Sequence, residues 1–161
     1  MKFVPRAIQD VMLRSSRIFP AVVLTGPRRA GKTTVFRRLF ERAAYLLLED
    51  PDIQARARAD PRGLIEDLRP PVLLDEIQNV PELFAYVRTQ IDQNPRKMGQ
   101  WLFTGSQDAP LMQGVTESMA GRAAILQLFF TPQSGGNGSR QLSSGRLPGG
   151  ARAPSRTGFV V

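Results

Sequence analysis

Two glycines separated by four residues, followed by a lysine and two threonines, have the most distinctive chemical spacing in this sequence. Residues 25–34 read TGPRRAGKTT, and Gly26 to Thr33 match the pattern G-x-x-x-x-G-K-[ST]. Glycines in such a loop let successive backbone N–H groups converge on one anion. The candidate phosphate-binding residues are Gly26, Pro27, Arg28, Arg29, Ala30, Gly31, Lys32, Thr33 and Thr34. Lys32 would bridge the β- and γ-phosphates of a nucleotide, and Thr33 would hold Mg²⁺ through its hydroxyl.

A second candidate is the pair of carboxylates that follows the apolar run VLL at residues 72–74. A buried strand ending here places Asp75 and Glu76 at its carboxyl end, the edge where open α/β sheets bind ligands. Asp75 is then expected to bind Mg²⁺ directly or through a water, and Glu76 to orient and deprotonate an attacking water. A base for water favours hydrolysis over transfer to the hydroxyl of a second substrate.

Two further candidates depend on where their elements lie. In WLFTGS, residues 101–106, Thr104 or Ser106 could contact the γ-phosphate or the attacking water if this strand lies between the two already named. The alternative is an ordinary Gly-Ser loop after a core strand. Arg122 could stabilise transition-state charge in its own subunit or in a neighbouring one, and the alternative is an exposed arginine in an ion pair.

The apolar pattern of residues 1–130 alternates between strands and helices. Strands are predicted at 21–25, 45–48, 71–74, 100–104 and 124–130. Helices are predicted after Pro5, from about Lys32, from Pro61 with Asp60 as N-cap, and from Pro81. Strands separated by helices predict an α/β fold with a parallel sheet covered on both faces.

Composition limits the function classes. The chain has 161 residues, 42% of them apolar, and no run approaches the ~18 apolar residues of a membrane helix. It has no cysteine, and its first residues hold no apolar run of signal-peptide length, so we expect a cytoplasmic protein. The net charge of +8 invites a nucleic-acid interpretation. Half of that charge comes from four arginines after residue 130, where no acidic residue occurs.

Residues 1 to about 130 resemble the AAA-type ATPases of the prokaryotic AAA_14 family. The stretches that carry the resemblance are TGPRRAGKTT, LLLEDPD, PPVLLDEIQNVPELF, LFTGSQ and ESMAGR, in the family's order. The resemblance implies a P-loop NTPase, a three-layer α/β/α sandwich whose five-stranded parallel sheet has the order 5-1-4-3-2, and binding of ATP with Mg²⁺. It also implies a Walker A motif at 26–34, a Walker B motif at Asp75 and Glu76, a sensor-like Ser106, and an arginine finger at Arg122 that would act in a homo-oligomer.

The chain departs from the family pattern after Phe130. Family members continue into further helices and usually a second domain, whereas residues 131–161 hold half of the glycines, three prolines and five serines. We therefore predict an ATPase domain at 1–130 and a disordered tail at 131–161. Our hypothesis is that the tail arose by a frameshift or truncation, which would remove the lid of the AAA fold and impair turnover.

Two alternatives to an ATPase stay open at the level of sequence. A small-molecule P-loop kinase would need an arginine-rich lid, and Arg56, Arg58 and Arg62 are candidates for it. A non-catalytic module that binds nucleic acid or a protein partner would use the basic charge, although no aromatic-rich stacking face accompanies that charge.

Overall fold

Five parallel strands form one sheet at the centre of the fold. The structure is a computed structural model that describes residues 6–106 and 109–128. Its strands are β1 (Ala21–Thr25), β2 (Ala44–Leu47), β3 (Val72–Asp75), β4 (Trp101–Gly105) and β5 (Ala123–Gln127). Its helices are α1 (Arg6–Ile18), α2 (Lys32–Leu39), α3 (Pro51–Ala59), α4 (Pro61–Asp67), α5 (Leu83–Gln93) and α6 (Ala109–Met119), with a 3₁₀ turn, η1 (Ile77–Asn79). The predicted tail at 131–161 lies outside the described residues.

The order of the strands places three loops at one edge of the sheet. The order is β2-β3-β4-β1-β5, and every neighbouring pair is parallel. This is the predicted AAA-like order, read from the other side. Strand β4 lies between β1 and β3. The loops that follow these three strands therefore lie next to one another at the carboxyl ends of the strands.

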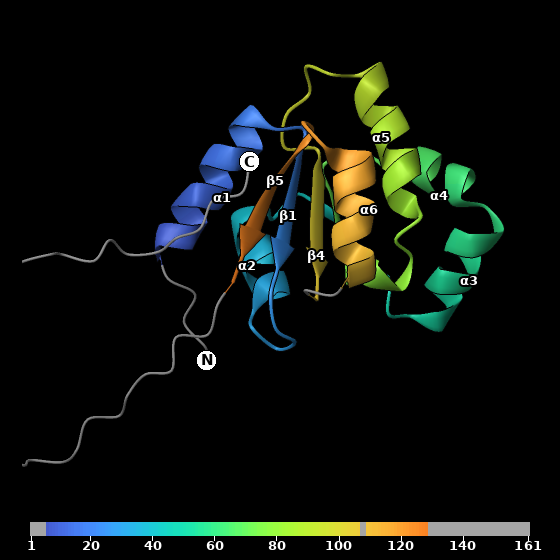
Figure 1. The fold of residues 1–161 in the computed structure, drawn as a ribbon, viewed down its shortest axis with the longest axis horizontal. Coiled ribbons are helices and arrows are strands. Elements are labelled where there is room, and N and C mark those ends of the chain that lie inside the picture. Colours follow the sequence, from blue (N-terminus) through green and yellow to red (C-terminus); the bar gives the residue numbers. More distant parts are fainter. Residues whose placement is uncertain (1–5, 107–108, 129–161) are drawn as a thin grey trace, which may run out of the picture.

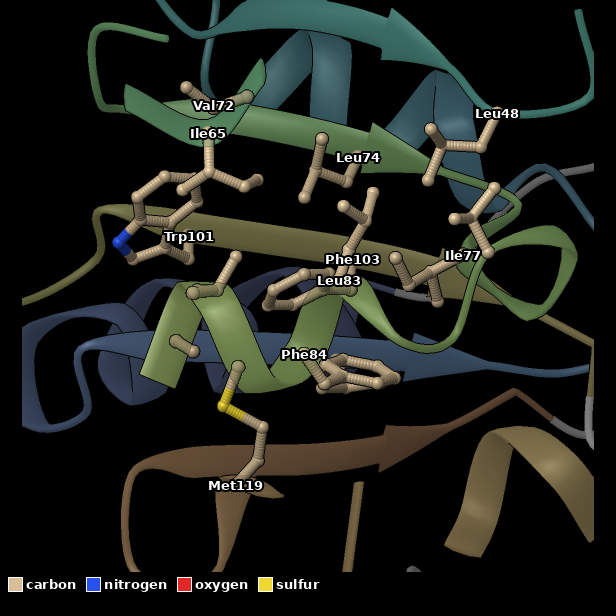
Figure 2. Packing of buried hydrophobic residues seen from close by; sticks show 14 of the residues in the cluster. Leu48, Ile65, Val72, Leu74, Ile77, Leu83, Phe84, Trp101, Phe103 and Met119 are labelled. Atoms are coloured by element: carbon tan, nitrogen blue, oxygen red, sulfur yellow. The ribbon is translucent and has the colours of Figure 1, made fainter. Parts of the chain in front are cut away.

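Helices cover both faces of the sheet, as predicted. Helices α1 and α2 lie on one face, and α3, α4, α5 and α6 lie on the other (Figure 1). Successive side chains of a strand point to opposite faces of the sheet. Val22 therefore packs with α1 and α2, whereas Val23 packs with the larger cluster of α3–α6. Figure 2 shows part of this larger cluster, in which the rings of Phe84 and Phe103 lie 4.9 Å apart.

Most predicted elements are present with ends shifted by a residue or two. The predicted cap of α4 is confirmed, because the Asp60 carboxylate accepts a hydrogen bond from the Gly63 N–H at 2.9 Å. Strand β5 begins at Ala123 and ends at Gln127, and residues 129 and 130 of its predicted span lie outside the described part. Helices α3 and α6 were not predicted. Within the described residues, no helix is both long and apolar enough to cross a membrane.

Candidate functional site

The loop between β1 and α2 needs glycine at its two ends. Gly26 has φ 154°, and a Cβ there would come within 2.9 Å of Leu128. Gly31 has φ 84° and precedes the first turn of α2. Residues that carry a Cβ strongly disfavour the positive φ values of both glycines. The first backbone N–H groups of α2 have no partner within the helix, so the loop presents donors at the helix's positive end.

Lys32 is a buried cation beneath this loop. Its Nζ donates hydrogen bonds to the carbonyl oxygens of Gly26 at 3.0 Å and Pro27 at 2.9 Å. Burial lowers the pKa of the ammonium group, and the negative charges of Glu76 and Asp75 oppose that effect. The lysine is therefore held inside the loop, beside two carboxylates.

Asp75, the last residue of β3, accepts hydrogen bonds from three hydroxyl groups. Thr33 Oγ1 donates to its two oxygens at 2.8 and 3.0 Å, and Thr104 Oγ1 donates to Oδ1. Tyr45 donates to Oδ2 at 2.7 Å. These donors come from α2, β4 and β2, so the buried carboxylate joins three separate elements.

Tyr45 reaches the site from the edge strand β2. Its residue surface is 41% exposed, yet its hydroxyl points to Asp75, and the Arg37 guanidinium lies 5.2 Å from the ring centroid. Burial of the hydroxyl and its hydrogen bond to Asp75 raise the pKa of Tyr45 to about 12. The tyrosine therefore stays a neutral donor to Asp75 at ordinary pH.

Glu76 leaves the strand in a strained backbone conformation. Its φ is 58° in the left-handed region, which costs a residue other than glycine on the order of 1–3 kcal/mol. Its backbone N–H donates to Thr104 Oγ1 at 3.0 Å, and its carboxylate accepts a hydrogen bond from the Gln78 amide. Such strain tends to occur at functional sites, because the surrounding structure must hold the residue in place.

The loop after β1, the start of α2 and Glu76 together line an open hollow of about 250 Å³. It is lined by Arg29, Ala30, Gly31, Lys32, Thr33, Thr34 and Glu76. The residues fit a magnesium nucleotide: backbone donors and a lysine suit phosphate oxygens, and a hydroxyl beside a carboxylate suits a hard cation. Thr33 and Asp75, 42 positions apart in sequence, are the pair that would hold the metal.

Ser106 and Arg122, the two weaker candidates, lie in different places. Ser106 follows β4 at the same edge as the loop, and its N–H donates to Gln78 Oε1 at 3.2 Å. Arg122 precedes β5 at the amino ends of the strands, level with Pro20, so Gly26 at the start of the loop lies roughly 20 Å away along the strand direction. Its guanidinium donates to the Asp92 carboxylate at 2.7 and 3.1 Å, which lowers the pKa of Asp92. Arg122 therefore does not line the hollow of its own chain.

The arginines considered for a kinase lid do not line the hollow. Arg56 pairs with Asp67 at 2.6 Å, and Arg58 donates to the carbonyl of Asn79 at 3.0 Å. Both contacts link α3 to neighbouring elements instead of reaching toward the loop.

Sequence reasoning missed Tyr45 and Gln78 as parts of the site. Gln78 lies inside the DEIQN stretch that carries the family resemblance, so its proximity to the carboxylates was a usable signal. Tyr45 gives no such signal, because its contact depends on the pairing of β2 with β3.

Comparison with known proteins agrees with this geometry. The profile of the AAA domain family AAA_14 matches residues 19–134. The uncharacterised proteins Rv2008c of Mycobacterium tuberculosis and Mb2031c of Mycobacterium bovis are each 34% identical over 110 residues, which is 68% of this chain and 25% of theirs. This chain thus spans about a quarter of the length of the curated relatives it matches.

Among solved structures, the crystal structure of a DNA replication initiation factor aligns with a TM-score of 0.45 at 13% identity. The alignment covers 76% of this chain and 44% of that one. The family profile covers most of the chain, including the loop, the two carboxylates and all five strands. This chain belongs to the AAA_14 family of AAA domains and carries its P-loop nucleotide-binding fold.

Proposed function

We propose that this chain binds ATP with Mg²⁺ and hydrolyses it to ADP and phosphate. The observation that carries the proposal is the contact of Thr33 with Asp75 at 2.8 Å, which lies beside Lys32 and Glu76. One contact brings together the hydroxyl and the carboxylate that a magnesium ion needs, next to a cation for phosphate and a base for water.

The loop between β1 and α2 would bind the phosphates of ATP. The N–H groups of residues 28–33 and the Nζ of Lys32 would contact the β- and γ-phosphates. Thr33 Oγ1 and the Asp75 carboxylate would hold Mg²⁺. When bound, Mg²⁺ neutralises charge on the phosphate oxygens and so favours attack at phosphorus.

Hydrolysis would use the carboxylate of Glu76. Glu76 accepts a proton from water while the water oxygen forms a bond to the γ-phosphorus. The bond between that phosphorus and the β–γ bridging oxygen breaks, and its electron pair leaves with ADP. Ser106, at the same edge, would contact the γ-phosphate or the attacking water.

Arg122 would act on a neighbouring subunit. It lies at the amino ends of the strands, away from the hollow of its own chain, and its side chain is partly exposed, so we place it at the γ-phosphate of a second copy of the chain. We include homo-oligomerisation through this end of the sheet in the proposal, with Arg122 as the finger that stabilises transition-state charge.

The test compares wild type with Glu76→Gln and Lys32→Ala. Wild type should bind Mg-ATP and release phosphate. Glu76→Gln should bind with an affinity within about threefold of wild type and lose phosphate release by about 10²-fold or more, because only the base is lost. Lys32→Ala should weaken ATP binding by about 10- to 100-fold, the value of a charge-assisted hydrogen bond.

Lys97→Ala is the matched control, because it removes a lysine far from the loop and should leave binding and turnover unchanged. Equal ATP affinity in wild type and Lys32→Ala would refute nucleotide binding at this loop. Loss of ATP that requires a small-molecule acceptor would favour the kinase alternative over hydrolysis.

A further inference from the structure

The side-chain amide of Gln78 bridges two parts of the site that come from different strands. Its Nε2 donates a hydrogen bond to Glu76 Oε2 on the β3 side. Its Oε1 accepts a hydrogen bond from the Ser106 N–H, just after β4, at 3.2 Å. One side chain thus contacts both the proposed base and the turn that would face the γ-phosphate.

The chemistry of the two contacts fixes which way the amide points. The carboxylate can only accept a hydrogen bond, and the Ser106 N–H can only donate one. Turning the amide over would place oxygen against oxygen and N–H against N–H. Only a carboxamide supplies the donor and the acceptor at the two ends, and asparagine is one methylene shorter.

The local backbone keeps Gln78 in this position. Ile77 is fully buried, and it anchors η1 under the sheet edge. Asn79 reinforces the turn, because its Nδ2 donates to the Glu76 carbonyl at 3.0 Å. A Cβ at Gly105 would come within 2.9 Å of Gln78 Oε1, so the small residue there leaves room for the amide.

We propose that Gln78 is a positioning residue that holds the Glu76 carboxylate at the hollow and makes its position depend on the Gly105–Ser106 turn. This inference rests on the proposed function in one respect, namely that Glu76 is the base. A shift of the turn on contact with a γ-phosphate would reach Glu76 through the amide. The base is then aligned when the phosphate is in place.

The kinetic test uses Gln78→Leu, which keeps the volume and removes both hydrogen bonds, and Gln78→Glu, which removes the donor and adds a negative charge beside Glu76. For both variants we expect kcat to fall by about 10- to 100-fold and the KM for ATP to stay within about threefold. Gln113→Leu is the matched control, because it breaks a Gln–Glu hydrogen bond on the exposed face of α6, and it should change neither constant.

A second test needs no turnover. In the nucleotide-free protein, Gln78→Leu should move the Ser106 amide proton resonance upfield and speed its exchange with solvent. Glu76→Ala should also move that resonance in wild type, but not in the Gln78→Leu background, because the amide carries the effect. Far-UV circular dichroism confirms that each variant is folded. Gln78→Ala, which also lacks both the donor and the acceptor, replaces Gln78→Leu if Gln78→Leu does not fold.

The outcomes separate the two claims. A wild type that binds ATP but never hydrolyses it overturns the proposed function, and the Ser106 resonances then decide whether the amide bridge exists. Wild-type kcat in the Gln78 variants of an active protein overturns the inference. Parallel changes in kcat and KM, or additive effects of Glu76→Ala and Gln78→Leu on the Ser106 resonance, also overturn it.

Discussion

At the scale of single residues, the site is organised around one carboxylate. Asp75 accepts hydrogen bonds from Thr33, Tyr45 and Thr104, and it is 3% exposed. Three donors fix both of its oxygens, so the carboxylate cannot rotate without losing a hydrogen bond. A metal ligand that is already oriented loses little freedom on binding, which favours affinity and a defined geometry.

The hydroxyl of Tyr45 provides a pH-dependent readout of this arrangement. Its pKa in the folded chain is about 12, above the ordinary value of 10.0, so the folded state keeps a proton that the unfolded state releases. The stabilisation is fully present below pH 10 and is lost as the pH rises toward 12. Between these values, the free energy of unfolding of wild type should fall more steeply than that of Tyr45→Phe.

Ultraviolet absorbance gives an independent check, because the chain has only two tyrosines. The difference between the titration curves of wild type and Tyr45→Phe should have its midpoint near pH 12 while circular dichroism shows a folded chain. A midpoint near 10 would mean that the Tyr45–Asp75 hydrogen bond does not form in solution.

Sequence predicted part of this site and not the rest, for a physical reason. Lys32, Thr33 and the glycines lie in one local segment whose spacing encodes its geometry. Asp75 and Glu76 are recognisable because a buried strand ends in charge. The contacts of Tyr45 with Asp75 and of Gln78 with Ser106 form only when strands distant in sequence pair. The contact of Gln78 with Glu76 is local and lies within the DEIQN stretch.

At the scale of elements, two helices were missed for reasons that lie within their own segments. Helix α3 has weak apolar periodicity, and only Ala57 of its residues is fully buried. Its start is set by polar chemistry, because Asp50 accepts a hydrogen bond from the Asp52 N–H at 2.9 Å ahead of Pro51 at the first helical position. Helix α6 contains Gly114, whose small size lets the helix approach Phe84.

The packing of α5 on the sheet should be the main source of stability on that face. Phe84 is fully buried against Phe103, as Figure 2 shows, so Phe84→Ala removes a large side chain from a closed space. We expect the free energy of unfolding in urea to fall by about 3–5 kcal/mol. Ile18→Ala is the control, because Ile18 is 65% exposed and its loss should cost less than about 1 kcal/mol. A similar cost for both would show that the core is not packed as described.

At the scale of the whole molecule, the described residues form one P-loop nucleotide-binding fold. The chain spans about a quarter of its curated relatives, and the family match covers residues 19–134. Our proposal that residues 131–161 form a separate tail predicts that a chain ending at residue 130 binds ATP with unchanged affinity.

The role of Arg122 between subunits can be tested by mixing two inactive variants. Glu76→Gln lacks the base, and Arg122→Ala lacks the finger, so each should be inactive alone. In mixed assemblies some sites combine an intact Glu76 with an intact Arg122, and phosphate release should return to roughly a quarter to a half of wild type. Full activity of Arg122→Ala alone would leave Arg122 with only its exposed ion pair to Asp92.

The central claim is that Thr33 and Asp75 form a magnesium site beside bound ATP, and a calorimetric titration tests it most directly. ATP is titrated into wild type and Asp75→Asn, with Mg²⁺ present and with Mg²⁺ removed by chelation. We predict that Mg²⁺ strengthens ATP binding to wild type by about tenfold or more, and that Asp75→Asn loses this gain while keeping the affinity measured without metal. An ATP affinity that is the same with and without Mg²⁺ in wild type, or a gain of equal size in Asp75→Asn, would contradict the account.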